Sequence, residues 1–184
     1  VNVSAEERKK ALVDYALPKN IKKMQADMEK YKIFYDKWFF ESELHKSGAV
    51  KAVVDLLTEK GLTYEKDGAV WYKNKEVLTQ KLLKEGKSQK YIDNLELKDD
   101  VLIRQNGNPT YFTADIAYHK NKFDRGFTTL IDVWGADHHG HVMRMKGAMD
   151  AIGYDGDKLN VVLMQLVKLV KDGELVKMSK RTGK

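Results

Sequence analysis

Apolar residues recur at helical spacing over much of the first sixty positions of the chain. The pattern covers residues 4–15, 18–32 and 48–60. Apolar positions three or four residues apart are typical of a helix that buries one face. Ser4 and Glu7 have the spacing of a capping box, in which each side chain satisfies a free backbone N–H at the start of a helix. The pattern therefore predicts three helices in this part of the chain.

Short β-favouring runs lie between and after these helices. The aromatic run at residues 36–40 is typical of a strand. Residues 62–65 and 69–73 flank an Asp-Gly pair, which favours a hairpin. Residues 76–93 are highly charged and helix-prone. We therefore interpret residues 1–100 as one segment of helices with a small β-hairpin.

The pattern changes near residue 101, where strands and helices begin to alternate. A short strand at residues 101–104 precedes a predicted helix at 113–123. The β-branched run at 128–134 is typical of a strand buried on both faces. A predicted helix that ends at Gly153 separates this run from a second apolar run at 160–169. A strand, a helix and a strand at this spacing predict a βαβ unit in a parallel sheet, so residues 101–184 form an α/β segment.

Composition and charge narrow the class of protein. The chain has 33 basic and 27 acidic residues, and the net charge of +6 favours an anionic partner such as ATP or RNA. Lysines are spread along the sequence, so solvated helix faces explain the charge equally well. The absence of cysteine excludes disulfides and thiolate metal sites. No apolar run approaches the roughly 18 residues that a membrane span needs, and the polar start of the sequence argues against a secretory signal peptide.

The richest chemistry follows the two strands of the predicted parallel unit, where ligands of such sheets bind. The second strand leads, after a turn, to Lys177, Met178, Ser179 and Lys180. Two ammonium groups three residues apart can contact one polyphosphate and neutralise the charge that develops on a leaving phosphate. A random basic tail would supply the charges without this order. The order is that of the second signature of class I aminoacyl-tRNA synthetases, which binds ATP in that family.

The first strand leads to a cluster of histidines and an aspartate at residues 134–141. Gly135 allows a ligand to approach the backbone, and Asp137 is placed to accept hydrogen bonds from ribose hydroxyls. Asp137, His138 and His139 are also compatible with a metal site, as in one family of metal-dependent phosphoesterases. A third interpretation is structural, with the histidines at the start of the next helix.

Tyr111 and Asp115 flank the start of the helix predicted at residues 113–123. A carboxylate pairs with a guanidinium through two parallel hydrogen bonds, and a phenol ring can stack on the guanidinium plane. The alternative is that Asp115 is only a first-turn carboxylate, stabilised by the helix dipole.

These three segments, together and in this order, closely resemble the arginyl-tRNA synthetases, and the bacterial type above all. The resemblance is specific over about residues 101–183 and looser over residues 37–72. It implies an α/β fold in which residues 101–184 are the second half of a Rossmann-like nucleotide-binding fold with a parallel sheet. Residues 1–100 then correspond to the part between the two halves of the catalytic domain. The His-His-Gly-His run at 138–141 lies too close to Lys177 to be the family's first signature, which we expect to be missing here.

The resemblance also implies roles for individual residues. The residues implied for arginine binding are Tyr111, Asp115 and His138. The residues implied for ATP binding are Gly135, Asp137, His138, Lys177, Met178, Ser179 and Lys180. Among these, Lys177 and Lys180 would be catalytic, because they stabilise the departing pyrophosphate.

The same resemblance implies the reaction and the partners of the parent enzyme. That enzyme would be a cytoplasmic ligase that uses arginine, ATP and tRNA(Arg), with Mg²⁺ bound to ATP and no dedicated protein metal site. Without the first signature, we expect this chain alone to be inactive. A half sheet exposes an edge and an apolar face, so we also expect self-association. The alternatives are the metal-dependent phosphoesterase and a non-catalytic nucleic-acid-binding module.

Overall fold

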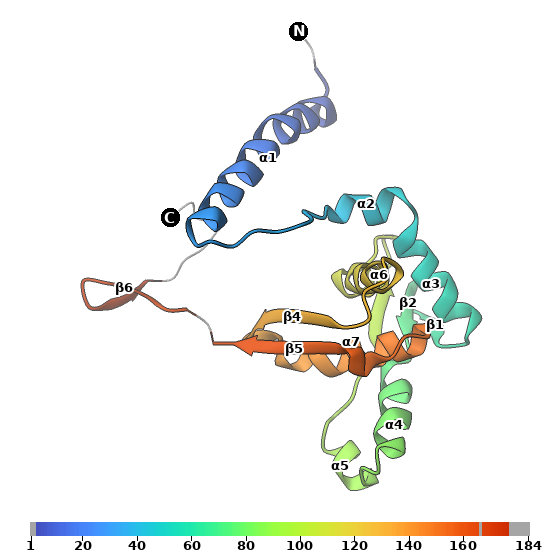
Figure 1. Cartoon of the computed structure of the whole chain (residues 1–184). Helices are drawn as coiled ribbons and strands as arrows, with labels where there is room; N and C mark the ends of the chain where they lie inside the picture. Colours follow the sequence, from blue (N-terminus) through green and yellow to red (C-terminus); the bar gives the residue numbers. More distant parts are fainter. Residues whose placement is uncertain (1–2, 166, 177–184) are drawn as a thin grey trace. The chain divides into compact units, whose positions relative to one another are not determined.

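The computed structural model describes residues 3–165 and 167–176, and the chain divides into two compact units, Val1–Phe40 and Glu41–Lys184. The first unit contains one long helix, α1 (Ala5–Lys30) (Figure 1). The predicted capping box is confirmed, since Glu7 N donates to Ser4 Oγ at 3.2 Å and Ser4 N donates to Glu7 Oε2 at 2.9 Å.

Two expectations for the first unit are wrong. The helices predicted at residues 4–15 and 18–32 form a single helix, with Pro18 inside it. Proline removes one backbone hydrogen bond but leaves those of the neighbouring turns in place, so the helix continues through it. The aromatic run at residues 36–40 has irregular backbone rather than a strand. A strand needs a paired neighbour to satisfy its N–H and C=O groups, and no described strand pairs with this run.

The second unit begins with α2 (Glu41–Lys46) and α3 (Ala49–Glu59), followed by the strands β1 (Thr63–Lys66) and β2 (Ala69–Tyr72). The predicted hairpin is confirmed, and its turn has positive φ at both central residues, 51° at Asp67 and 71° at Gly68. Such a turn matches the twist of paired strands and is favoured by the Asp-Gly sequence.

A third strand, β3 (Asp100–Ile103), pairs antiparallel with β2 and gives the sheet order β1-β2-β3. Between β2 and β3 lie α4 (Asn74–Lys84) and α5 (Gln89–Asp93). The helix-prone run at residues 76–93 is therefore two helices, separated at Gly86, whose φ is 78°. This three-stranded sheet combines residues from before and after position 100. The division of the chain into residues 1–100 and 101–184 stays a prediction.

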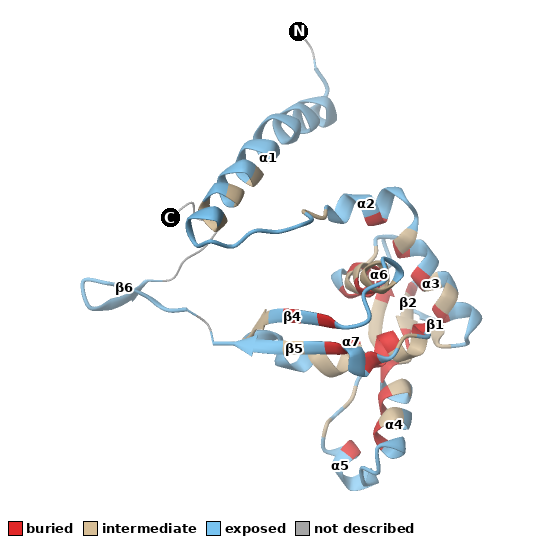
Figure 2. Cartoon of the chain, in the orientation of Figure 1, coloured by how far each residue is buried: buried red, intermediate tan, exposed pale blue. Residues whose placement is uncertain are grey.

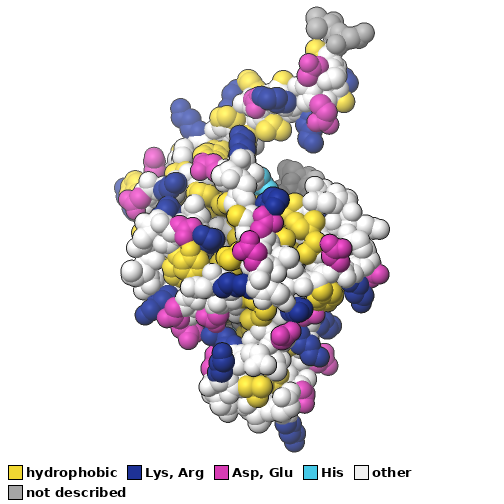
Figure 3. All heavy atoms as spheres, turned by 90° about the vertical axis from the view of Figure 1, so that its right-hand side faces the viewer, with side chains coloured by type: hydrophobic (Ala, Val, Ile, Leu, Met, Phe, Trp, Pro, Cys, Tyr) yellow, Lys and Arg dark blue, Asp and Glu magenta, His cyan; other side chains and the backbone are white. Residues whose placement is uncertain are grey.

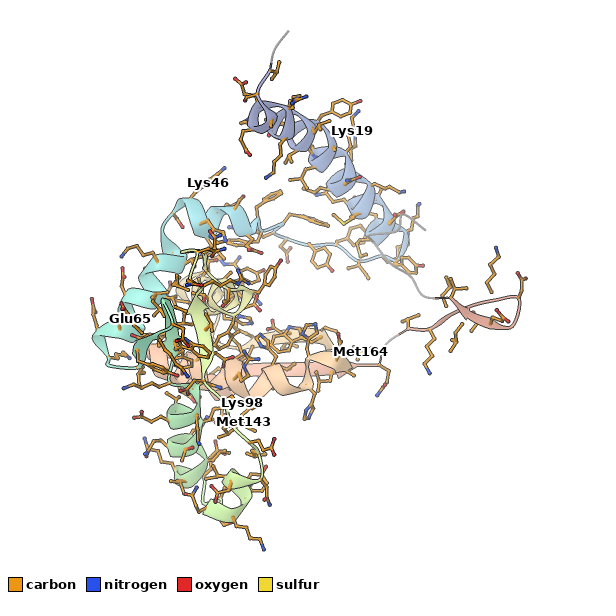
Figure 4. All side chains as sticks on the ribbon, turned by 180° about the vertical axis from the view of Figure 1, so that it is seen from behind. Lys19, Lys46, Glu65, Lys98, Met143 and Met164 are labelled. Carbon is orange, nitrogen blue, oxygen red and sulfur yellow. The ribbon has the colours of Figure 1, made fainter. Side chains whose placement is uncertain are left out.

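The predicted βαβ unit is confirmed. Helix α6 (Tyr111–Asp124) precedes β4 (Leu130–Gly135), the short helix η1 (Ala136–His138), α7 (His139–Ile152), η2 (Gly156–Lys158) and β5 (Leu159–Met164). Strands β4 and β5 pair in parallel over their whole length, from Leu130 opposite Leu159 to Gly135 opposite Met164. Met164, labelled in Figure 4, therefore marks the edge at which both strands end.

The composition of β4 predicted a strand buried on both faces. This prediction is wrong, because only one face of the strand is buried. Leu130 and Asp132 are buried, whereas Ile131 and Val133 on the opposite face are 68% and 67% exposed. Figure 2 shows that both buried and exposed positions occur along β4. On β5, Val162 and Met164 lie opposite Val133 and Gly135 and are also exposed. The described residues thus cover one face of the parallel pair and leave the other as an open apolar surface.

The core of the second unit lies where α3, α4, α6 and α7 meet the two sheets. Its largest fully buried side chains are Tyr72, Leu57, Leu78, Leu102, Ile116, Met145, Met149 and Leu159. Helices α4 and α7 approach so closely that a Cβ on Gly147 would lie 2.6 Å from Leu78 Cδ2. A larger residue there would therefore require the buried Leu78 side chain or the helix that carries it to shift.

The described chain ends in a hairpin of β6 (Leu169–Lys171) and β7 (Glu174–Val176). Its turn at Asp172 and Gly173 was predicted, and φ is positive at both residues. The residues proposed for the ATP loop, Lys177, Met178, Ser179 and Lys180, lie outside the described residues. Among the helices that the structure describes, none is long and apolar enough to span a membrane.

Candidate functional site

A pocket of about 480 Å³ lies between the start of α6 and the start of α7. Its lining residues are Tyr111, Phe112, Asp115, Asp137, His138, Gly140, His141 and Arg144. The structure thus brings together four of the predicted site residues, from two segments that are more than twenty positions apart in the sequence. Gly135 precedes η1 at the end of β4 and is not part of the lining.

A second, smaller hollow of about 240 Å³ adjoins this pocket. Its lining residues are Asp115, Tyr118, His119, Lys122, Asp132, Trp134, His138 and His141. Asp115, His138 and His141 line both spaces and therefore form the wall between them.

Another hollow of about 490 Å³ is lined by residues of α4 and α7 and contains none of the predicted site residues. Its central cation, Lys81, is already paired with Asp150 at 2.8 Å. Because Lys81 already has a carboxylate partner and no predicted site residue lines this hollow, we place the candidate site at the pocket between α6 and α7.

The start of α6 is held to strand β3 by two threonines. Thr110 caps the helix, accepting from Thr113 N at 3.4 Å and donating to the carbonyl of Val101 at 2.8 Å. Thr113 Oγ1 donates to the carbonyl of Leu102 at 2.7 Å. These bonds fix the first turn of α6, which carries Tyr111. Sequence reasoning overlooked both threonines, although a threonine before a helical run is a common N-cap signal.

On that first turn, neighbouring residues point in different directions. Phe112 is buried, whereas Tyr111 is 79% exposed. The carboxylate of Asp115 is about half exposed, and its Oδ2 lies 3.3 Å from His141 Nε2. A phenol and a partly desolvated carboxylate on one wall are suited to a planar cation such as a guanidinium.

Asp137 and His138 lie on η1, directly after β4. Both side chains are 59% exposed, and Asp137 Oδ2 is 3.8 Å from His138 Nε2. The rings of His138 and His141 lie 6.3 Å and 5.2 Å from that of Trp134. The end of β4 therefore presents an exposed carboxylate beside a group of aromatic rings.

The metal-site hypothesis for Asp137, His138 and His139 finds no support in this geometry. Among the described residues, no three histidine, aspartate or glutamate side chains lie close enough to hold a metal ion. His139 is exposed and begins α7. An arrangement of three or four converging ligands is what a metal-dependent phosphoesterase needs.

Two polar contacts near the site were not predicted from the sequence. The first is a buried group in which His119 Nε2 lies 2.5 Å from Asp132 Oδ2 and Lys122 Nζ lies 2.8 Å from Asp132 Oδ1. Burial raises the pKa of the Asp132 carboxyl, but the hydrogen bonds from His119 and Lys122 outweigh it and leave that pKa below its ordinary value. The sequence signal for this group was Asp132, a charged residue at an inward position of an otherwise apolar strand.

The second contact joins Arg144 of α7 to Asp100 of β3. Both guanidinium edge groups bond the carboxylate, with Nε 3.0 Å from Oδ2, and the guanidinium carbon lies 4.8 Å from the Phe112 ring centre. Burial raises the pKa of the Asp100 carboxyl, and the neighbouring Arg144 only partly offsets it. Arg144 therefore lines the pocket and contacts residues of two other elements, β3 and α6.

Comparison with known proteins finds relatives among the arginine–tRNA ligases. No protein-family model matches the chain. An arginine–tRNA ligase of Caldanaerobacter subterraneus subsp. tengcongensis is 55% identical over 184 residues, which are all of this chain and 30% of the relative. One of Ruminiclostridium cellulolyticum is 51% identical over 185 residues, again 30% of its length. Over its whole length, the chain is similar to one segment of the arginine–tRNA ligases. It spans about 30% of the length of these relatives.

Solved structures agree with this similarity. A protein described as an arginyl-tRNA synthetase from Campylobacter jejuni matches with a TM-score of 0.71 at 37% identity, covering 91% of this chain and 33% of that one. The arginyl-tRNA synthetase of Thermus thermophilus, at 17% identity and a TM-score of 0.60, shares the fold over 76% of this chain. The predicted resemblance to arginyl-tRNA synthetases is confirmed, and so is a mixed α/β fold with a parallel pair of strands.

Proposed function

We propose that this chain is the arginine- and ATP-binding part of an enzyme that activates arginine and transfers it to tRNA(Arg). The observation that carries the proposal is the shared pocket of Tyr111, Asp115, Asp137 and His138 in a chain that is similar, over its whole length, to one segment of an arginine–tRNA ligase. The substrates arginine, ATP and tRNA(Arg) and a cytoplasmic location are parts of the same proposal.

Arginine would bind with its side chain against α6. The guanidinium pairs with the Asp115 carboxylate, which is half exposed at the pocket wall. Tyr111, at 79% exposure, can cover the guanidinium plane, and His138 also lines the pocket. A charged, planar ligand gains both direction and strength from such a carboxylate, because two parallel hydrogen bonds fix its orientation.

ATP would bind at the end of the parallel strands. Asp137 is exposed on η1, where its carboxylate can accept from ribose hydroxyls, and Gly135 precedes it at the end of β4. Lys177, Met178, Ser179 and Lys180 complete this proposed ATP site from a segment outside the described residues. We assign β4, α7 and β5 to the second half of a Rossmann-like fold, with residues 1–100 preceding it.

Mg²⁺ would enter this site with ATP. The carboxylates at the pocket are those of Asp115 and Asp137, too few for a protein cage but enough for an ion held mainly by phosphate oxygens and water. Bound in that way, Mg²⁺ supplies charge neutralisation to the triphosphate.

The proposed reaction is an in-line attack of the arginine carboxylate on the α-phosphate of ATP. The new P–O bond forms as the bond to pyrophosphate breaks, and arginyl-adenylate results. The arginyl group then passes to a ribose hydroxyl of the tRNA, and AMP leaves. The residues of this chain hold the reactants in line and neutralise charge, and no covalent enzyme intermediate is needed.

The test is arginine-dependent ATP–pyrophosphate exchange by a full-length arginine–tRNA ligase that carries this segment. Asp115→Asn keeps the shape of the side chain and removes its charge. Loss of a charged hydrogen bond costs about 1.5–3 kcal/mol, so kcat/KM for arginine is expected to fall roughly ten- to hundredfold. The matched control is Asp124→Asn, at the other end of the same helix. An unchanged kcat/KM in Asp115→Asn would overturn the assignment.

A further inference from the structure

We propose that His119 is a positioning residue for the arginine-binding carboxylate of Asp115, which it aligns by linking helix α6 to strand β4. The inference rests on the proposed function, because it concerns the same pocket. His119 is 3% exposed and lies behind the pocket wall rather than on it. It therefore acts through Asp115 and does not touch the substrate.

Both ring nitrogens of His119 are engaged. Nδ1 lies 2.7 Å from the carbonyl oxygen of Asp115, and Nε2 lies 2.5 Å from Oδ2 of Asp132. A carbonyl oxygen only accepts hydrogen bonds, and so does an ionised carboxylate. The ring therefore links the backbone of Asp115 to the side chain of Asp132.

This bridge joins the two elements that carry the site. Asp115 is on α6, and Asp132 is on β4, three residues before Gly135 and five before Asp137. Lys122, one turn further along α6, bonds the other oxygen of Asp132 at 2.8 Å. Two side chains of one helix thus bond a single carboxylate of the strand. These two bonds oppose both sliding and rotation of the helix against the strand.

The surroundings make this geometry rigid. Asp132 is 7% exposed, so water cannot readily replace a lost partner. The ring of His119 also meets the edge of Trp134, at 6.3 Å between ring centres, and Trp134 in turn contacts His138 and His141. A shift of His119 would therefore move the backbone of Asp115, and misplacement of a binding group by about 1 Å can reduce rates a hundredfold.

A buried hydrogen-bonded group that serves stability alone would give a different result on substitution. It would change the melting temperature and the fraction of active enzyme, while leaving the Michaelis constants of the active molecules unchanged. A positioning role instead raises the KM for arginine selectively, because Asp115 is displaced while the residues proposed for ATP keep their own supports.

The experiment uses two conservative variants in the full-length ligase that carries this segment. His119→Gln places an amide N–H near the position of Nε2 and retains the link to Asp132. His119→Asn places one near Nδ1 and retains only the bond to the Asp115 carbonyl. The control is Asp124→Asn, which removes an ion pair of the same helix with Lys120. KM for arginine and KM for ATP are measured separately in pyrophosphate exchange, at a temperature where circular dichroism shows each variant folded.

We expect His119→Asn to raise KM for arginine about tenfold or more with KM for ATP within about twofold, and His119→Gln to recover most of the loss. Asp132→Asn should reproduce the effect of His119→Asn, and the double variant should add little. Equal KM values for arginine in His119→Asn and the wild type overturn the proposal, as does an equal rise in both KM values. If the wild-type enzyme lacks arginine-dependent exchange, the proposed function itself fails, which is a separate outcome.

Discussion

The carboxylate of Asp115 and the imidazole of His141 are in contact in the wall of the pocket, with Oδ2 and Nε2 3.3 Å apart. The two residues come from different helices, and they are 26 positions apart in the sequence. His141 is the more buried partner, with its side chain 17% exposed against 49% for Asp115. The more buried imidazole is thus suited to orient the more exposed carboxylate at the pocket wall.

This relationship predicts a moderate effect on arginine binding. His141→Phe keeps an aromatic ring and removes the hydrogen bond, which contributes about 0.5–1.5 kcal/mol. KM for arginine should rise about three- to tenfold in pyrophosphate exchange by the full-length ligase. His141→Gln, which can still donate to Asp115, should stay close to the wild type. Equal KM values in all three enzymes would show that His141 does not orient the carboxylate.

A second prediction concerns the proposed ATP loop. Lys180→Ala and Lys177→Ala remove charge that would neutralise the departing pyrophosphate, so the adenylation rate should fall by at least about a hundredfold. Arginine binding should change little, because Asp115 and Tyr111 are on another element. The measurement is single-turnover adenylate formation beside equilibrium binding of arginine. A parallel weakening of both would argue for a merely structural role of the loop.

A third prediction concerns the isolated 184-residue chain. We expect no arginine-dependent pyrophosphate exchange, since the relatives are about three times as long and supply further groups. We also expect self-association through the open face of β4, where Ile131 and Val133 are exposed. Sedimentation velocity should show the association weakened by Ile131→Lys. Leu12→Lys on α1 is a matched control, because both side chains are 68% exposed.

If the two lysine variants have the same effect on association, the face of β4 is not the contact surface. If the purified chain catalyses exchange after removal of contaminating host synthetase, the chain contains a more complete site than we propose.

A fourth prediction concerns stability in acid. The pKa of Asp132 is below its ordinary value, so in the interval between the two the unfolded chain binds more protons than the folded one. The stabilising contribution of Asp132 is therefore complete above its ordinary pKa of about 3.9 and is lost as the pH falls through the lowered value. At neutral pH, Asp132→Asn should reduce the free energy of unfolding by about 3 kcal/mol.

The check is urea unfolding of the wild type and Asp132→Asn between pH 7 and acid. The difference in unfolding free energy between them should shrink as the pH falls below the ordinary value. Asp137→Asn, at an exposed carboxylate, serves as a control. A difference that stays constant with pH would mean that the charge of Asp132 does not contribute.

Surface charge in the structure bears on the hypothesis of a nucleic-acid-binding module. On the face seen in Figure 3, basic and acidic side chains are interspersed rather than separated. Five of the described lysines pair with a carboxylate one helical turn away, as Lys51 does with Asp55 at 2.6 Å. Such pairs are typical of solvated helix faces, and the homology to arginine–tRNA ligases gives that hypothesis no support.

Much of the local structure followed from the sequence alone. The capping box at Ser4, the Asp-Gly hairpin, the helix ending at Gly153 and the strands of the βαβ unit were all predicted. Each depends on residues within a few positions of one another, where spacing and backbone preference decide the outcome. That Tyr111 and Asp115 line the same pocket was also predictable, because both belong to the first two turns of one helix.

What only the tertiary structure decided involves residues that are distant in the sequence. The contacts of Thr113 with Leu102, of His119 with Asp132 and of Arg144 with Asp100 depend on how helices pack on strands. Likewise, the composition of β4 indicated its tendency to form a strand but not which of its faces would be covered. Hydrophobic pattern records which side chains favour burial, whereas the packing of neighbouring elements determines which of them become buried and which polar groups find partners.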